Sequence, residues 1–357
     1  MDTNKAMIAM SGGVDSSVAA YLTLQDGYAC VGATALLCGS KLLGGCEPAD
    51  IAGDAKAVAQ RLGIPFYSFD RQDLFCQQVV EPFIQIYEDG CTPNPCILCN
   101  NRIKFGDLLE KAQELGCHWI VTGHYARISQ DPQTGRYLLY KAPDKDKDQS
   151  YFLAGLTQQQ LSHVRFPLGD LTKEQVRQIA LEQGFINAKK RDSQDICFIP
   201  DGDYMAFIRR YTGKDYPAGD FLDLQGKVVG KHEGAIRYTL GQRKGLGLAM
   251  GAPVYVCSKD MEKNTVTVGP NEALFSSTLL ASGWNWIPFD SLEAPMRVTA
   301  KARSRHAGAP ATVYPEGAFA RVVFDEPQRA ITPGQAVVLY DGDLVVGAGT
   351  ITEVRTN

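Results

Sequence analysis

Hydrophobic and polar positions follow two different periods along the chain, and the first half of the chain shows the pattern of alternating strands and helices. Short apolar runs typical of buried strands occupy residues 6–10, 30–37, 66–69 and 119–122. Segments with apolar residues at helical spacing follow at residues 14–22, 50–62, 74–87 and 105–115. Strands separated by helices predict an α/β fold with a doubly wound parallel sheet.

The second half of the chain has the two-residue period of half-buried strands. Beyond about Tyr204 glycine becomes frequent, and apolar residues alternate with polar ones at residues 254–256, 265–268, 311–314, 320–324 and 336–340. Asp341-Gly342-Asp343 is a hairpin signal. This pattern predicts a small β-barrel at the end of the chain.

Composition adds limits to this picture. The 357 residues are long for one core, so we expect two or three domains. Apolar runs stay shorter than a membrane span and the start lacks signal-peptide character, which predicts a cytoplasmic protein without a membrane partner. Ten cysteines at irregular spacing indicate thiols and not a disulfide framework. A net charge of −4 argues against a generally cationic surface but allows local basic contacts to nucleic acid.

The turn after the first predicted strand has the features of an anion site. Strand, glycine pair and helix bring free backbone N–H groups and a helix N-terminus to one place. We expect Gly12 and Gly13 to take positive φ, and Asp15 to hold Mg²⁺ as an oxygen ligand. The stretch matches neither the common NTPase loop nor the dinucleotide loop, and the structural alternative is a serine-capped turn. Hydroxyl donors would come from Ser11, Ser16 and Ser17.

Three cysteines stand out by their context. Cys96 and Cys99 form a Cys-x-x-Cys pair next to a loop that Pro93 and Pro95 make rigid. Such a pair is compatible with half a zinc site, a redox pair or two buried thiols, and the chain has no second Cys-x-x-Cys. Cys197 lies in an apolar segment, where a core cysteine is the structural alternative.

These motifs occur together in one known order. The loop Ser-Gly-Gly-Val-Asp-Ser resembles that of the ATP pyrophosphatase superfamily, whose members cleave ATP to AMP and pyrophosphate. Residues 11–16, 92–100, 103–105, 122–127, 147–152, 192–199, 238–247 and 330–335 resemble, in the same order, the motifs of the tRNA-specific 2-thiouridylases. This resemblance implies ATP-dependent conversion of the wobble uridine of tRNA to 2-thiouridine. It also implies a catalytic domain (1–206), a small central tRNA-contacting domain (207–281) and a C-terminal β-barrel (282–357).

The resemblance also implies roles for individual residues. Cys99 would be the nucleophile, and Cys197 would carry a persulfide and form a transient disulfide with Cys99. A separate protein would deliver the persulfide sulfur. ATP would be bound by Ala9, Met10, Ser11, Gly12, Gly13, Val14, Asp15 and Ser16, with backbone contacts from Leu36 and Gly123. Asn94, Pro95 and Cys96 would border the flipped base, and His124, Lys147, Asp148, Gln149, Arg303, Ser304 and Gln335 would contact tRNA.

The chemistry requires thiolates, so we expect both catalytic cysteines to have a lowered pKa, with Lys104 and Arg102 as sources of positive charge. Many relatives carry Asp where Cys96 stands. With a cysteine at this position, Cys96, Cys99 and Cys197 could together hold a [4Fe–4S] cluster that delivers sulfide. The persulfide route, which needs only Cys99 and Cys197, is our working hypothesis. The remaining alternatives are an ATP pyrophosphatase that acts on a small acid, and an RNA-binding module with a structural metal on Cys96 and Cys99.

Overall fold

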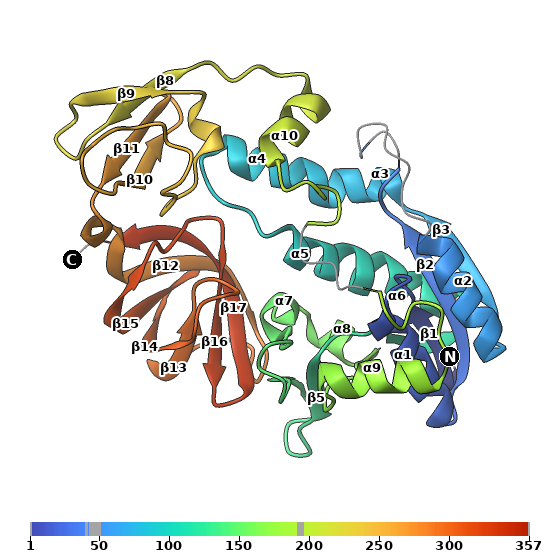
Figure 1. The fold of residues 1–357 in the computed structure, drawn as a ribbon. Coiled ribbons are helices and arrows are strands. Elements are labelled where there is room, and N and C mark those ends of the chain that lie inside the picture. Colours follow the sequence, from blue (N-terminus) through green and yellow to red (C-terminus); the bar gives the residue numbers. More distant parts are fainter. Residues whose placement is uncertain (1, 40–41, 43–50, 191–195, 356–357) are drawn as a thin grey trace. The chain divides into compact units, whose positions relative to one another are not determined.

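The computed structural model describes residues 2–39, 42, 51–190 and 196–355 (Figure 1). Contacts divide the chain into two compact units. Unit 1 comprises Met1–Val80, Pro95–Asp203 and Asp343–Val345. Unit 2 comprises Glu81–Asn94, Tyr204–Gly342 and Val346–Asn357. Among the described helices, none is both long and apolar enough to cross a membrane.

Unit 1 is built on a five-stranded parallel sheet with the order β3-β2-β1-β4-β7. The strands are β1 (Asp2–Ala9), β2 (Ala29–Leu36), β3 (Phe66–Asp70), β4 (Cys117–Val121) and β7 (Val164–Arg165). The chain moves outward from β1 to β3 and then returns to the other side of β1 with β4. This reversal confirms the predicted doubly wound sheet, and sheets of this type bind ligands at the carboxyl ends of the strands that flank the reversal, here β1 and β4.

The helices of unit 1 follow the predicted pattern. They are α1 (Val14–Gln25), α2 (Ile51–Leu62), α3 (Gln72–Phe75), α5 (Pro95–Leu98), α6 (Leu108–Glu114), α7 (Ser150–Leu153), α8 (Gln158–Leu161) and α9 (Lys173–Glu182). Helix α9 begins with a capping box, in which the Thr172 hydroxyl accepts from the Gln175 N–H and the Gln175 side chain accepts from the Thr172 N–H. A hairpin of β5 (Ala126–Gln130) and β6 (Tyr137–Lys141) follows β4.

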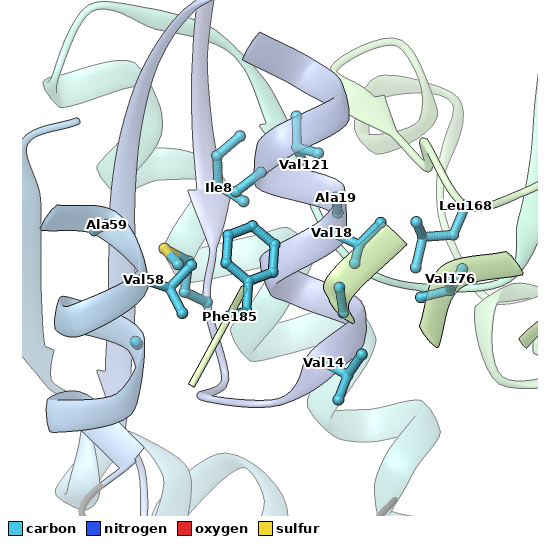
Figure 2. Close-up of a cluster of buried hydrophobic side chains, with 14 of the residues drawn as sticks. Ile8, Val14, Val18, Ala19, Val58, Ala59, Val121, Leu168, Val176 and Phe185 are labelled. Carbon is cyan, nitrogen blue, oxygen red and sulfur yellow. The ribbon is translucent and has the colours of Figure 1, made fainter. Parts of the chain in front are cut away.

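An apolar core fixes α1 against its neighbours (Figure 2). Val14 and Val18 recur at helical spacing and are both buried, as are Ile8 of β1 and Val176 of α9. Phe185 lies between Val18 of α1 and α2 (Figure 2). Complete burial of such side chains contributes about 1.5–3 kcal/mol each, so this core holds the first turn of α1 in place beside β1.

Two predicted helices differ from regular α-helices. The segment predicted at residues 74–87 consists of α3, a π-helix η1 (Cys76–Val80) and α4 (Glu81–Glu88). The segment predicted at residues 105–115 begins within a nine-residue π-helix η2 (Cys99–Asp107), which continues into α6. π-Helices are rare and frequently occur at functional sites. Here η2 begins at one of the two predicted catalytic cysteines.

Unit 2 contains two β-structures. The first is a four-stranded sheet with the order β10-β11-β8-β9, and the second is a barrel in which β12-β15-β14-β13-β16-β17 closes through pairing of β12 with β17. The barrel confirms the fold predicted for the end of the chain, whereas the boundaries at residues 206 and 281 stay predictions. The four-stranded sheet comprises β8 (Gly219–Leu222), β9 (Val228–His232), β10 (Tyr255–Asp260) and β11 (Thr265–Gly269). The barrel comprises β12 (Phe275–Trp286), β13 (Met296–Lys301), β14 (Ala309–Glu316), β15 (Phe319–Arg329), β16 (Ala336–Asp341) and β17 (Leu344–Arg355).

Unit 2 also includes α4, α10 (Tyr204–Thr212) and the short 3₁₀-helices η3 (Ala235–Arg237) and η4 (Asn271–Leu274). Aromatic rings join α4 to α10. Tyr87 stacks on Tyr204 with ring centroids 4.7 Å apart, and Phe83 meets Phe207 edge-on at 6.4 Å. These contacts tie residues 81–94, which lead to the predicted cysteine pair, to the rest of unit 2.

Candidate functional site

The loop between β1 and α1 has the shape of an anion-binding turn. Gly12 has φ +67°, as predicted. This backbone conformation is disfavoured for residues with a Cβ atom, which explains why glycine stands at this position. The prediction of positive φ was wrong for Gly13, which is extended at φ −97° and forms the N-cap of α1 without a side-chain hydrogen bond. Gly13 therefore provides no side-chain cap to the first N–H groups of α1. A phosphate that binds at a helix N-terminus requires such uncapped N–H groups.

The serine hydroxyls of this loop have different tasks. Ser16 and Ser17 are buried, and each hydroxyl donates to the Gly13 carbonyl, at 3.1 and 3.0 Å. The Ser11 N–H donates to the Ser16 hydroxyl oxygen at 3.2 Å, while Ser11 itself is exposed. Ser16 and Ser17 thus shape the turn, and the hydroxyl of the exposed Ser11 lies 3.4 Å from that of Ser16.

Gly123 brings the end of β4 against the start of α1. A Cβ atom at Gly123 would lie 2.6 Å from the Asp15 carbonyl carbon and 2.7 Å from the Ser16 nitrogen, so only glycine fits. On the other side of β1, Thr34 of β2 donates to the Met10 carbonyl at 2.7 Å, two residues before Leu36. The predicted ATP-binding segments are therefore neighbours at one edge of the sheet, although their contact with ATP stays a prediction.

Lys173 is a component of this loop that the sequence did not reveal. Its ammonium donates to both carboxylate oxygens of Asp15, at 2.7 and 2.8 Å, and only 8% of the residue is exposed. The Tyr125 hydroxyl donates to the same carboxylate at 2.9 Å. The capping box at Thr172 begins α9, so Lys173 lies in the first turn of this helix. Packing of α9 against α1 then brings its ammonium to Asp15.

These contacts bear on the Mg²⁺ ion predicted at Asp15. Both carboxylate oxygens already accept from Lys173, and the described residues contain no group of three His, Cys, Asp or Glu side chains that could hold a metal ion. Asp15 is thus engaged by Lys173, and a Mg²⁺ ion at this residue stays a prediction. Positive charge at the loop comes from Lys173 and from Lys190, whose ammonium lies 3.3 Å from the Gly12 carbonyl and 2.7 Å from Asp54.

The predicted catalytic thiols occupy unit 1 together. Cys96 lies in the short helix α5 and is exposed, Cys99 begins η2 and is buried, and Cys197 is exposed. The charge of Lys104, on the next turns of η2, acts on all three thiols. Arg102 does not share this task, because its guanidinium donates to the Gln78 carbonyl and side chain at 3.1 and 3.3 Å.

The expectation of lowered thiol pKa values was wrong. Burial raises the pKa of Cys99 to about 12, and desolvation also raises the pKa of Cys96 despite its exposed surface. Lys104 lowers the pKa of each thiol, but one ammonium does not offset the loss of hydration. The raised pKa values keep these thiols protonated at neutral pH.

Cys38 is a fourth thiol that sequence analysis missed. The Cys197 thiol is hydrogen-bonded to Cys38, and this bond is the largest cause that raises the pKa of Cys197 well above its usual value, followed by burial. Cys38 lies two residues beyond the end of β2, and no motif marks it. Cys96, Cys99 and Cys197 act electrostatically on one another, so these three thiols lie close together, and the choice between the persulfide and the cluster route stays a prediction.

His124 is held inside unit 1. Its Nδ1 forms a 2.7 Å hydrogen bond with the Thr122 hydroxyl, and the rings of Phe105 and Phe166 lie 5.7 and 5.8 Å from its ring. Burial, followed by the charge of Lys104, holds the pKa of His124 well below its usual value. The imidazole is therefore neutral, and its contact with tRNA stays a prediction.

The predicted tRNA contacts at residues 147–149 form a structured loop. Asp148 accepts from the N–H groups of Ala142 and Ser150, both at 3.1 Å, and from the Ser150 hydroxyl at 2.9 Å. Gln149 exchanges hydrogen bonds with the backbone of Tyr125. These two side chains shape the loop, and Lys147 is half-buried within it.

The predicted tRNA contacts of unit 2 are also engaged. Gln335 donates to the carbonyls of Thr92 and Pro93, and Arg303 donates to the carbonyls of Ala330 and Leu240. Ser304 is half-buried, as is Asn94, while Pro95 is buried in unit 1. Whether these residues contact tRNA stays a prediction.

Comparisons with known proteins agree with this architecture. A family model described as the tRNA methyl transferase HUP domain matches residues 4–201, and the tRNA methyl transferase PRC-barrel domain and aminomethyltransferase beta-barrel domain match residues 205–270 and 276–351. The tRNA-specific 2-thiouridylase MnmA of Clostridioides difficile is 48% identical over 97% of this chain and 98% of its own length. Those of Acetivibrio thermocellus and Moorella thermoacetica are 49% and 50% identical over 98% of this chain, and are covered over 100% and 99% of their own lengths.

A solved structure, the U34-tRNA thiolase NcsA of Methanococcus maripaludis with its [4Fe-4S] cluster, aligns with a TM-score of 0.34 at 16% identity, covering 58% of this chain and 70% of that one. A likeness at this level carries no argument. The parallel sheet and its glycine loop, together with the matching models, define a HUP-domain protein with two C-terminal β domains. Within that class, the chain belongs to the tRNA-specific 2-thiouridylase family.

Proposed function

We propose that this protein is an ATP-dependent tRNA-uridine 2-sulfurtransferase, which converts the wobble uridine to 2-thiouridine. The observation that carries the proposal is that unit 1 contains both an anion-binding loop at the start of α1 and the thiols of Cys96, Cys99 and Cys197. The loop suits ATP cleavage and the thiols suit sulfur transfer. Full-length identity near one half to proteins named 2-thiouridylases supports the same conclusion.

The proposed ATP site lies at the carboxyl ends of β1 and β4. The phosphates would meet the N-terminus of α1, the Gly12–Gly13 backbone and the Ser11 hydroxyl. Lys173 and Lys190 would neutralise their charge, since one ammonium lies at Asp15 and the other at the Gly12 carbonyl. Leu36 and Gly123 would contribute backbone contacts beside the nucleotide.

The proposed reaction has three bond exchanges. The 2-oxygen of uridine attacks the α-phosphorus of ATP and pyrophosphate leaves, which converts a poor leaving group into AMP. The outer sulfur of a persulfide on Cys197 then attacks C2 and displaces AMP. Finally the Cys99 thiolate attacks the Cys197 sulfur, which releases 2-thiouridine and leaves a Cys99–Cys197 disulfide for a thiol reductant to reopen.

The proton on Cys99 sets a requirement for this sequence of steps. A pKa of about 12 means that the thiolate is scarce at neutral pH. Lys104 is the cation that acts on Cys99, Cys96 and Cys197, so we assign it the task of stabilising the thiolate once substrates are bound. His124 is neutral and buried, and its position suits packing better than general base catalysis.

The proposed substrate requires access to the target base. The atom to be replaced lies on the base edge, so the nucleotide must leave its stack and enter a pocket beside ATP. Asn94, Pro95 and Cys96 would border that base, and residues 147–149, His124, Arg303, Ser304 and Gln335 would line the path of the tRNA. A persulfide-carrying protein would reload Cys197, which is exposed.

The test of this function is the dependence of AMP formation on tRNA. The protein is incubated with labelled ATP, with and without unmodified tRNA whose wobble base is uridine, and AMP and pyrophosphate are measured. We expect both products only with this tRNA, while a tRNA with cytidine at the wobble position serves as the control. Equal AMP formation without tRNA, or with a small carboxylic acid in its place, would favour the small-acid alternative.

A further inference from the structure

The side-chain amide of Gln335 holds the polypeptide just before the predicted catalytic loop. Its Nε2 donates to the Thr92 carbonyl and to the Pro93 carbonyl, both at 3.0 Å. The Thr92 N–H donates in turn to the Pro333 carbonyl, also at 3.0 Å. Three hydrogen bonds within unit 2 thus connect residues 92–93 to the turn at residues 332–335 between β15 and β16.

The turn is shaped for this contact. Gly334 has φ +87°, and a Cβ atom there would lie 2.8 Å from the Cys91 Cβ and 3.0 Å from the Thr92 nitrogen and oxygen. Only glycine permits so close an approach of the two backbones. The Gly334 N–H donates to the Ile351 carbonyl, and the Ile351 N–H donates to the Gln335 carbonyl, both at 2.9 Å, so the turn is anchored to β17.

Arg303 supports the turn from its other end. Its guanidinium donates to the Ala330 carbonyl at 2.5 Å, to the Leu240 carbonyl at 3.4 Å and to the Thr332 hydroxyl. Thr332 is completely buried, and its hydroxyl donates to the Ala330 carbonyl at 2.9 Å. The guanidinium therefore holds the backbone at residues 330–332 in the conformation that presents Gln335.

The held residues lead directly into the base-bordering segment. Pro93 is followed by Asn94, Pro95 and Cys96, and the two prolines have fixed φ angles and restrict the residues before them. Few rotations therefore separate the Thr92–Pro93 carbonyls from Cys96.

We propose that Gln335 is a positioning residue that fixes the Thr92–Pro93 backbone and thereby sets the placement of Asn94, Pro95 and Cys96. This inference rests on the proposed function for its catalytic meaning. It gives Gln335 a task in the free protein, in addition to the tRNA contact that the family resemblance implies. A residue that only contacted tRNA would leave the loop unchanged until tRNA arrived.

The first test measures the loop in the absence of any substrate. Gln335→Glu keeps the shape of the side chain but replaces the donating amide by a carboxylate that only accepts. Amide hydrogen exchange at Thr92, whose N–H bonds to the Pro333 carbonyl, is compared in the wild type and the variant. We expect exchange about ten-fold faster, because the turn and residues 92–93 separate more often. Unchanged exchange at Thr92 would overturn the proposal.

The matched control is Gln328→Glu. Gln328 is a half-buried glutamine of β15 whose amide donates to the Glu326 carbonyl at 2.9 Å. This variant adds the same charge to the same unit and should leave Thr92 exchange as in the wild type. Comparable acceleration in Gln328→Glu would show a general charge effect and would also overturn the proposal.

The second test separates positioning from tRNA binding. For Gln335→Glu we expect a single-turnover rate about ten-fold lower, while the Kd for tRNA stays within about three-fold. A weaker Kd with an unchanged single-turnover rate would assign Gln335 to tRNA contact alone. It would overturn the proposal that Gln335 positions residues 94–96 for the reaction. If the wild type forms no 2-thiouridine, the proposed function fails. The exchange measurement still decides whether Gln335 holds the Thr92–Pro93 backbone.

Discussion

The ammonium of Lys173 lies 2.7 and 2.8 Å from the two carboxylate oxygens of Asp15, and it joins residues 158 positions apart in the sequence. Lys173 starts α9 and Asp15 lies in the first turn of α1, so the pair fixes the two helix N-termini relative to each other. A partly buried cation thus stands beside the loop that we propose for the phosphates of ATP. Asp15 then serves to hold Lys173 in place.

Lys173→Met should reduce tRNA-dependent pyrophosphate release by at least about 100-fold, because it removes both the phosphate-facing charge and the partner of Asp15. The Kd for tRNA should stay within about two-fold, since Lys173 is 8% exposed. Pyrophosphate release and tRNA binding are measured on the same preparation. Lys56→Met, at an exposed position of α2, is the matched control. Near-normal pyrophosphate release from Lys173→Met would remove this residue from the ATP site.

The raised pKa of Cys99 predicts a pH dependence of its reactivity. Because the pKa is about 12, the thiolate fraction of the free protein should grow about ten-fold per pH unit from pH 7 to 9.5, without a plateau. Iodoacetamide labelling of Cys99, followed by peptide mass spectrometry, measures this fraction. A plateau near pH 7 would show an activated thiolate in the free protein and contradict the structure.

Lys104→Met should slow the labelling of Cys99 by about three- to ten-fold at pH 8, because the ammonium lowers the pKa of this thiol. Arg102→Met is the matched control, since Arg102 lies on the same π-helix but donates to Gln78. Equal slowing in the two variants would show that the effect comes from the helix as a whole and not from the charge at Lys104.

Cys38→Ala should accelerate the labelling of Cys197. The hydrogen bond in which the Cys197 thiol donates to Cys38 is the largest cause of the raised pKa of Cys197, so its removal lowers that pKa and increases the thiolate at a given pH. Cys76→Ala, which removes another half-buried thiol, should leave the rate unchanged. Slower labelling of Cys197 in Cys38→Ala would mean that Cys38 activates Cys197 instead of restraining it.

Cys96→Ser separates the two sulfur routes. The persulfide route needs only Cys99 and Cys197, so the variant should keep more than about one third of wild-type thiolation. The cluster route needs three thiolates, and the variant would lose both activity and iron. Anaerobic purification with iron and sulfide analysis accompanies the assay. About four irons per wild-type chain, together with activity on sulfide alone, would contradict the persulfide route.

Features set by neighbouring residues were predictable from the sequence. The positive φ of Gly12 and the strand–helix alternation of unit 1 follow from short-range preferences, and the structure confirms both. The capping box at Thr172 and Gln175 has the same local origin. The close contact of Gly123 with the start of α1 follows from the doubly wound topology, which brings the ends of β1 and β4 together.

Features set by tertiary contacts were not predictable in this way. Lys173 and Asp15 meet only after α1 and α9 have packed, and the spacing of apolar residues does not indicate which lysine faces a loop. The π-helical course of η2 depends on backbone hydrogen bonds that hydrophobic periodicity does not distinguish from those of an α-helix. The thiol pKa values went opposite to expectation because burial of Cys99 outweighs the charge of Lys104.

The central claim is that one protein joins ATP cleavage to sulfur insertion at the wobble uridine. The most direct test is nucleoside mass spectrometry of unmodified tRNA after incubation with the protein, ATP, Mg²⁺ and a persulfide donor, with AMP measured in parallel. We predict 2-thiouridine at the wobble position only, with one AMP formed for each sulfur inserted, and none with Cys99→Ser or Cys197→Ser. Formation of ADP in place of AMP, or thiolation of free uridine at an equal rate, would contradict this account.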